Sequence, residues 1–338
     1  MRRGSPSKGF LVLGEIRSGC LHSATLELTS KARLVADNLG IEVSTLLMYS
    51  EIDTEPETLV HYGADRVLCV RDDRLSLFDQ EVHSKILCRI IEEIDPEIVL
   101  APATTSGRTV MPAVAAMLGT GLTADCTELE IDLDTGLLLQ TRPAIGGNIM
   151  ATIKTPERRP QMATVRPRTF AIPAPNPDRR GRVTAMTFTD QCFESRIKPL
   201  GHGRFQEEDV NIQDRDIIVS GGKGMKKEDN FSLLRELAGL LDGGVGASRA
   251  AVDNKWIGYS HQVGLSGKVV APKVYFAVGI SGSVQHLAGM QTAELVVAIN
   301  KDPEAPIFRV ADIGLCGDLF DIMPRVIEGI RAREGVSG

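Results

Sequence analysis

The segment of this sequence with the clearest chemical use is an apolar run that ends in a turn of small residues. After Lys273, residues 274–280 are apolar, β-branched or aromatic; Ser281, Gly282 and Ser283 follow before residues 284–289. A buried strand that opens a helix through such a turn leaves free backbone N–H groups at the helix N-terminus. These groups suit a phosphate, a pyrophosphate or a reduced flavin ring. Turns of glycine and serine that bind no ligand have the same sequence pattern, so the neighbouring segments must show whether this turn belongs to a binding site.

Small and polar residues also follow the other predicted strands in the second half of the chain. They occur at positions 220–224, 243–251, 262–268, 300–303 and 311–319. Because ligands of open α/β sheets lie beyond the carboxyl ends of the strands, we expect these residues to line one edge of one sheet. A dinucleotide cofactor needs such an edge. The first half offers fewer candidates, at positions 104–108 and 119–125.

Other catalytic signatures are missing from the sequence. There is no G-x-x-x-x-G-K-[ST] phosphate loop, and no G-x-G-x-x-G opens a first strand–helix turn. No Ser/His/Asp or Cys/His set for nucleophilic catalysis is evident. The sequence therefore lacks the glycine fingerprint expected of a self-contained NAD(P)H dehydrogenase. His286 could equally be a residue of a capped helix or a ligand contact. Arg249 could be a partner in a surface ion pair.

The elements that must position these residues form two α/β regions. In the first, strands are predicted at residues 10–13, 43–48, 66–70 and 97–101, and helices at 28–39, 78–94 and 108–118. Their alternation predicts an open, mostly parallel, doubly wound sheet. The pattern then changes to strands with turn signals, which we interpret as an antiparallel extension at residues 129–131, 137–140, 149–153 and 162–165.

The second region predicts another open, mostly parallel, doubly wound sheet. Its strands are expected at residues 216–219, 274–278 and 295–299, and its helices at 231–241 and 322–330. Residues 166–182 are rich in Pro, Asn, Asp and Arg, which indicates a linker or an extended arm. A second break in composition comes at residues 201–209. We therefore predict a first domain at residues 1–204, which includes an arm at 166–204, and a second domain at residues 205–338.

Composition excludes several classes of function. The 338 residues carry a net charge of −6, so nucleic acid and anionic membranes are not expected partners. The longest apolar runs are far shorter than the roughly 20 residues of a membrane span. Six scattered cysteines and few histidines predict reduced thiols in a cytoplasmic protein, with neither disulfides nor a metal site.

Across nearly its whole length the sequence closely resembles the alpha subunit of electron transfer flavoprotein, most specifically over residues 220–318. The motifs that carry the resemblance are VGASRAAVD (245–253), GISG (279–282), VQHLAGM (284–290) and AINKDP (298–303). In the first domain they are TRPAIGGN (141–148) and RPQMATVRP (159–167).

The resemblance implies one FAD in the second domain and an obligate heterodimer with a beta subunit. It implies an electron carrier, in electron transport such as fatty acid beta-oxidation, between an acyl-CoA dehydrogenase-type flavoenzyme and another redox partner. One alternative is an electron-bifurcating flavoprotein that oxidises NADH, holds a second FAD where other beta subunits hold AMP, and serves ferredoxin or flavodoxin. Another is a nucleotide-binding regulatory module without a redox role.

The resemblance also implies roles for individual residues. Arg249 lies near the flavin ring and favours its reduced, anionic forms, Ser266 faces flavin N5, and His286 reaches the pyrimidine oxygens. The ribityl chain and pyrophosphate are lined by Ser248, Val263, Gly264, Leu265, Ser281, Gly282, Ser283, Val284 and Gln285, and the adenosine end by Asn300, Asp318 and Leu319. Three positions depart from the family: Lys223 replaces arginine, Leu265 replaces glutamine, and Ser266 replaces threonine but keeps the hydroxyl. Lysine at 223 loses the bidentate grip that arginine gives a phosphate.

Overall fold

A computed structural model describes residues 9–17, 19–144, 149–201 and 212–334. The chain divides into two compact units; among the described residues the first covers 9–144 and 150–201, and the second covers 212–334. The predicted domain boundary at 204/205, and most of the compositional break at 201–209, lie outside the described residues. We describe each unit by itself.

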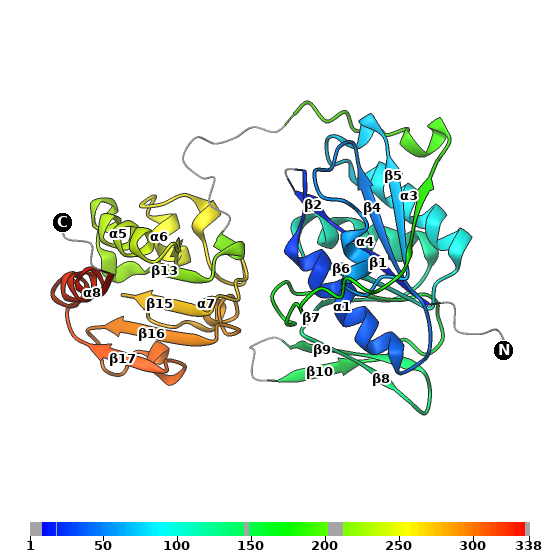
Figure 1. Ribbon diagram of the computed structural model, residues 1–338. Helices are drawn as coiled ribbons and strands as arrows, with labels where there is room; N and C mark the ends of the chain where they lie inside the picture. Colours follow the sequence, from blue (N-terminus) through cyan, green and yellow to red (C-terminus); the bar gives the residue numbers. More distant parts are fainter. Residues whose placement is uncertain (1–8, 18, 145–148, 202–211, 335–338) are drawn as a thin grey trace. The chain divides into compact units, whose positions relative to one another are not determined.

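The first unit is built on a seven-stranded parallel sheet (Figure 1). In spatial order the strands are β12 (Arg182–Met186), β5 (Arg66–Arg71), β4 (Val43–Tyr49), β1 (Phe10–Leu13), β6 (Ile98–Pro102), β11 (Gln161–Val165) and β7 (Leu122–Cys126). The main helices are α1 (Ser23–Asp37), α3 (Gln80–Ile94) and α4 (Thr105–Leu118). Shorter elements are β2 (Ile16–Arg17), β3 (Cys20–Leu21) and α2 (Thr58–His61). The predicted alternation of strands and helices is confirmed.

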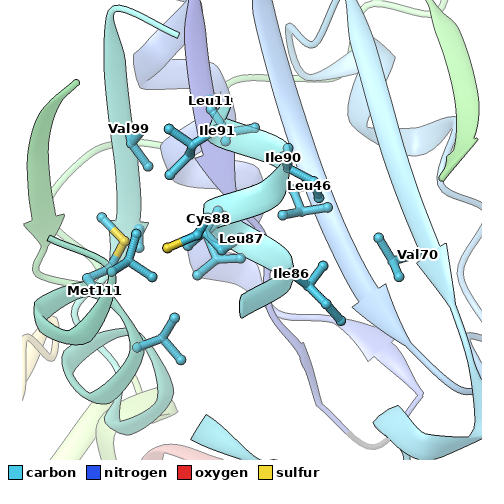
Figure 2. Close-up of a cluster of buried hydrophobic side chains, with 14 of the residues drawn as sticks. Leu11, Leu46, Val70, Ile86, Leu87, Cys88, Ile90, Ile91, Val99 and Met111 are labelled. Carbon is cyan, nitrogen blue, oxygen red and sulfur yellow. The ribbon is translucent and has the colours of Figure 1, made fainter. Parts of the chain in front are cut away.

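Helices cover both faces of this sheet because adjacent residues of each strand point to opposite sides. On one face, α3 and α4 pack on side chains of β1, β4, β5, β6 and β11. Figure 2 labels part of this cluster: Leu11, Leu46, Val70, Ile86, Leu87, Cys88, Ile90, Ile91, Val99 and Met111. On the other face, Leu28, Ala32 and Val35 of α1 pack against Phe10 and Val43. The stripe at three- and four-residue spacing in α1 therefore becomes one wall of the core.

A three-stranded antiparallel sheet extends the first unit, as predicted. Its order is β10 (Met150–Ile153), β9 (Leu137–Pro143) and β8 (Glu128–Asp132). The prediction that residues 162–165 belong to this extension is wrong. They form β11, which pairs in parallel with β6 and β7 inside the main sheet. All five residues of β11 are buried, because a strand in the middle of a doubly wound sheet is covered on both faces.

The segment after β11 is held against the first unit. The carboxylate of Glu27 on α1 accepts hydrogen bonds from the backbone N–H groups of Arg168, Thr169 and Phe170, each at 2.8 Å. Further along, Arg179 pairs with Asp65 at 2.7 Å, and the chain then enters β12, which pairs with β5. The residues predicted as an extended arm thus follow the surface of this unit and end in an edge strand that the sequence did not predict.

The second unit is built on a five-stranded parallel sheet, also drawn in Figure 1. Its order is β14 (Gly244–Ala247), β13 (Ile217–Gly221), β15 (Val274–Val278), β16 (Leu295–Asn300) and β17 (Ile313–Cys316). The helices are α5 (Ser232–Leu240), α6 (Arg249–Asp253), α7 (Val284–Leu287) and α8 (Leu319–Glu334). The predicted fold class is confirmed: two open parallel sheets, the first with an antiparallel extension. The edge strands β14 and β17 were not predicted, because glycine in both weakens the strand pattern.

Two hydrophobic clusters cover the two faces of the second sheet. One joins Leu234 and Leu237 of α5 with Met323 and Ile327 of α8. The other includes Tyr275, Ala277, Ile280, Met290 and Ile307. In neither unit does a described helix combine the length and apolar character needed to cross a membrane.

Candidate functional site

A cavity of about 770 Å³ opens at the carboxyl ends of the strands of the second sheet. Its lining residues follow all five strands: Lys223, Gly224 and Lys226 after β13; Ser248, Arg249 and Ala250 after β14; Gly279, Ile280, Ser281, Ser283, Gln285 and His286 after β15; Asn300 and Lys301 at the end of β16; Asp318 and Leu319 after β17. Gln262, Val263, Gly264, Leu265 and Ser266 complete the lining from a loop beside β14. The cavity lies where open α/β sheets bind their ligands.

Most of the residues singled out from the sequence line this cavity. They are Lys223, Ser248, Arg249, Val263, Gly264, Leu265, Ser266, Ser281, Ser283, Gln285, His286, Asn300, Asp318 and Leu319. Gly282 and Val284 are not among its lining residues. Gly282 has φ +86°, and a Cβ there would lie 2.4 Å from the Ile307 backbone nitrogen, so it shapes the turn. Val284 is exposed at the start of α7.

Seven further lining residues were not named individually from the sequence: Gly224, Lys226, Ala250, Gln262, Gly279, Ile280 and Lys301. Gly224, Ala250, Gln262 and Lys301 lie in segments expected to line the edge, Gly279 and Ile280 end the apolar run, and Lys226 lies two residues beyond an expected segment, so position along the sheet edge was the available signal. Two of them add positive charge. Lys226 has φ +68° and places its Nζ atom 4.8 Å from the centre of the Phe320 ring, a cation–π contact.

Glycine allows two strand-end loops to touch through their backbones. A Cβ on Gly222 would lie 2.2 Å from the Gly279 carbonyl oxygen, and one on Gly224 would lie 2.7 Å from the Gly279 Cα. The Gly224 N–H donates to the Gly279 carbonyl at 3.0 Å, and Gly279 itself has φ +63°. Only glycine fits this contact without shifting backbone. The cavity wall here is therefore backbone, which a ligand can approach closely.

The charges on the cavity lining are mostly positive. The lining includes one carboxylate, that of Asp318, and four cationic side chains: Lys223, Lys226, Arg249 and Lys301. Asp318 Oδ1 accepts from the Phe320 N–H at 2.9 Å at the start of α8. The surplus of cations attracts an anionic ligand such as a pyrophosphate.

Arg249 has both of the roles that the sequence left open: it lines the cavity and it forms a surface ion pair. Its side chain lines the cavity, yet it is 71% exposed and its Nε lies 3.3 Å from Asp253 Oδ2 four residues along α6. This bond uses one of the five guanidinium N–H groups, so the others remain available to a ligand. Such an exposed pair contributes only about 0–1 kcal/mol to stability.

Ser266 and its loop are held in place by two bonds. Gln262 Nε2 donates to Ser266 Oγ at 3.0 Å, and the Tyr259 hydroxyl donates to the Ser266 carbonyl at 2.7 Å. The Ser266 hydroxyl keeps its own hydrogen for an acceptor in the cavity. Beside it, Leu265 is 69% exposed, which leaves an apolar side chain at the cavity for a ligand to cover.

His286 is a buried, neutral histidine. It is 4% exposed, and burial lowers its pKa to about 4, because the cation loses its hydration. Its Nε2 lies 2.9 Å from the Tyr275 hydroxyl. The Val263 backbone favours the protonated form, but Nδ1 makes no hydrogen bond of acceptable geometry with a described residue. His286 lies in α7, whose N-cap is Ser283, and it also lines the cavity, so the structure is consistent with both explanations that the sequence left open.

The candidates at the edge of the first sheet serve the fold. Thr104 caps α4, since its hydroxyl accepts from the Gly107 N–H at 3.1 Å. Gly107 packs so tightly that a Cβ would lie 1.9 Å from the Pro102 carbonyl oxygen. Arg108 pairs with Asp125 at 2.7 Å. Within the described residues, no group of three or more His, Cys, Asp or Glu side chains is placed to hold a metal ion.

Family models match most of the chain. The model described as electron transfer flavoprotein domain matches residues 10–191, and the one described as electron transfer flavoprotein FAD-binding domain matches residues 211–291. The second match includes the loops after β13, β14 and β15. The family models thus divide the chain in the same region as the two compact units.

Known proteins similar to this chain carry related names. Electron transfer flavoprotein subunit alpha of Thermoanaerobacterium thermosaccharolyticum is 45% identical over 96% of this chain and 98% of the relative. The protein of that name from Megasphaera elsdenii is 42% identical over 98% of each chain. Lactate dehydrogenase (NAD(+),ferredoxin) subunit LctC of Acetobacterium woodii is 38% identical over 97% of this chain and 78% of the relative. The chain belongs to the electron transfer flavoprotein alpha-subunit family, and its second unit carries the family's FAD-binding domain.

Proposed function

We propose that the cavity of the second unit binds one FAD and that the chain works in a heterodimer with a beta subunit as an electron carrier. The observation that carries the proposal is the cavity itself. It extends across the carboxyl ends of all five strands, its wall includes touching glycine loops, and cations outnumber acids on its lining. Bound FAD supplies the electron transfer chemistry, and the protein's residues position and tune it.

The residues fit the two ends of such a ligand. Lys223 and Lys301 suit a pyrophosphate, although a lysine binds as a point charge where arginine grips with two N–H groups. We assign the ring end to Arg249, Ser266 and His286, which follow β14 and β15 or lie in the loop beside β14 and supply hydrogen-bond donors. We assign the adenosine end to the loops that carry Asn300, Asp318 and Leu319.

We further propose that electrons pass from a flavin dehydrogenase of the acyl-CoA dehydrogenase type to another redox partner. A second candidate is favoured by the similarity to LctC, whose name includes NAD(+) and ferredoxin. In that case the heterodimer oxidises NADH, uses a second FAD in the beta subunit, and passes electrons to ferredoxin or flavodoxin. In a simple carrier, the beta subunit holds AMP in place of the second FAD.

The test is a count of flavin in the purified heterodimer. One FAD per dimer and no NADH oxidation support the simple carrier, whereas two FAD with NADH oxidation support the second candidate. Lys301→Gln should weaken FAD binding, because Lys301 lines the cavity. Lys227→Gln is the matched control, since Lys227 pairs with Asp229 at 3.0 Å outside the lining. A heterodimer without flavin, or equal binding by both variants, contradicts the assignment.

A further inference from the structure

Tyr275 is a buried phenol next to the proposed ring end of the cavity. It lies on β15 with no exposed surface, in the cluster that includes Ala277 and Met290. A phenol hydroxyl in such a core needs a hydrogen-bond partner. The structure places His286 Nε2 at 2.9 Å from it. A tyrosine of the central strand is thereby joined to a histidine of the cavity lining.

The direction of this bond follows from the surroundings of the phenol. Burial raises the pKa of Tyr275 above its ordinary value, so the hydroxyl keeps its proton at neutral pH. Ser220 lies near enough to oppose this rise. Its Oγ has no hydrogen bond of acceptable geometry with any described residue, and a neighbour that lowers the pKa of a phenol acts as a donor toward the phenol oxygen, which leaves the phenol proton for His286. The Tyr275 hydroxyl therefore donates to His286 Nε2.

The bond determines which nitrogen of His286 carries the proton. A neutral imidazole has one N–H and one acceptor nitrogen. Because Nε2 accepts from Tyr275, the proton resides on Nδ1. This Nδ1 is buried and without a hydrogen bond among the described residues, while its residue lines the cavity. A buried donor without a partner is unfavourable, and an acceptor atom of a ligand would satisfy it.

We propose that Tyr275 is a positioning residue that holds His286 in the Nδ1–H tautomer, so that a neutral imidazole presents one N–H to an acceptor of the cavity ligand. The ligand's identity as a flavin rests on the proposed function; the tautomer does not. A fixed neutral donor gains strength as negative charge grows on its acceptor, and it adds no charge of its own to the cavity. Tyr275 acts only through His286.

The first experiment reads the tautomer directly. The chain is labelled with ¹⁵N-histidine, purified with its beta subunit, and studied by long-range ¹H–¹⁵N NMR, with the His286 signals assigned by their loss in His286→Gln. In the wild type we expect the protonated shift on Nδ1. Tyr275→Phe removes the donor and keeps the ring, so the protonated shift should move to Nε2 or average between the two nitrogens.

The matched control is Tyr259→Phe. It removes another phenol near the same cavity, one that bonds to the Ser266 carbonyl at 2.7 Å and not to His286, so the tautomer should not change. A wild-type signal with the proton on Nε2 overturns the proposal without any variant, even if Tyr275→Phe fails to fold. An unchanged Nδ1–H pattern in Tyr275→Phe overturns it as well.

The second experiment measures flavin. Loss of an oriented donor should weaken FAD binding about two- to tenfold in Tyr275→Phe, and the flavin reduction potential should fall. A change of tautomer with unchanged FAD affinity and potential overturns the link to the ligand. If the wild type takes up no flavin while the tautomer still depends on Tyr275, the proposed function fails and the positioning role stands.

Discussion

The two sheets of this protein have the same architecture and different carboxyl edges. Both are open and parallel, but the edge of the second sheet is lined by glycine, small hydroxyl side chains and four cations around a cavity of about 770 Å³. At the first sheet, the corresponding turns hold structural groups: Thr104 caps α4, Gly107 packs on Pro102, and Arg108 pairs with Asp125.

The comparison shows that the fold offers a binding edge and the strand-end residues decide whether it is used. In the first unit, tight contacts at the edge stabilise a neighbouring helix. In the second, the tight contact of Gly222 and Gly224 with Gly279 forms part of a cavity wall. We expect substitutions at equivalent places to have different consequences in the two units. Four predictions follow this contrast, from the largest expected effect to the smallest.

Gly222→Ala tests the backbone contact in the second unit. The new Cβ would lie 2.2 Å from the Gly279 carbonyl oxygen, so we expect a loss of about 3–5 kcal/mol in stability and loss of FAD. Trp256, the one tryptophan of the chain, reports unfolding of this unit by its fluorescence. Gly107→Ala should destabilise only the first unit and leave FAD bound. Gly239→Ala, with no atom within 4 Å of its Cβ, is the neutral control. Equal loss of FAD from both clashing variants would remove the contrast.

His286 makes the second unit sensitive to acid. Its pKa is about 4 in the folded state, because burial disfavours the cation, against an ordinary histidine value of 6.5. Between these pH values only the unfolded state binds the proton, so stability falls as pH falls from 6.5 to 4, by up to about 3 kcal/mol. His286→Gln should flatten the pH dependence of the unfolding free energy reported by Trp256. A wild-type curve that is flat over this range argues against a neutral, buried His286. Half-buried His83 of the first unit has its pKa lowered in the same direction, because partial burial disfavours the cation, and serves as the comparison.

Glu27→Gln tests how the first unit uses its buried polar groups. The amide keeps one acceptor oxygen but turns its NH₂ group toward one of the backbone N–H groups of residues 168–170. An unpaired buried N–H costs about 1–3 kcal/mol. Amide hydrogen exchange should quicken at Arg168, Thr169 and Phe170, with FAD binding unchanged. Unchanged exchange at these amides would mean that Glu27 does not hold the segment.

Arg249→Ala should have the smallest effect on stability and a clear effect on redox chemistry. Its pair with Asp253 is exposed, so stability should change by less than about 1 kcal/mol. If the guanidinium faces the flavin, the reduction potential should fall by about 20–60 mV, as measured by spectroelectrochemistry. Arg235→Ala, on the exposed side of α5, should not shift it. Equal potentials in the two variants would leave Arg249 as a surface ion pair.

Much of the candidate site was readable from the sequence because its signals are local. A strand that ends in Gly-Ile-Ser-Gly, or a turn such as Ser-Gly-Gly-Lys, identifies a strand end wherever the strand lies in the sheet. The carboxyl ends of parallel strands then share an edge by geometry. Gly282 and Val284 were included because they belong to the same turn and motif, although neither is among the lining residues of the cavity. Lys226 and Lys301 were not named as site residues, because only Lys223 and Asn300 were named from the corresponding turns.

The sequence by itself determined the alternation of strands and helices, the parallel sheets and the glycine-rich edge of the second one, since periodicity and turn chemistry act over a few residues. Only the tertiary structure decided what depends on contacts distant in sequence. It placed residues 161–165 in the main sheet between β6 and β7, and it bound residues 168–170 to Glu27. It also joined Tyr275 to His286, which burial keeps neutral. Strand pairing and burial are properties of the packed chain, so no local pattern contains them.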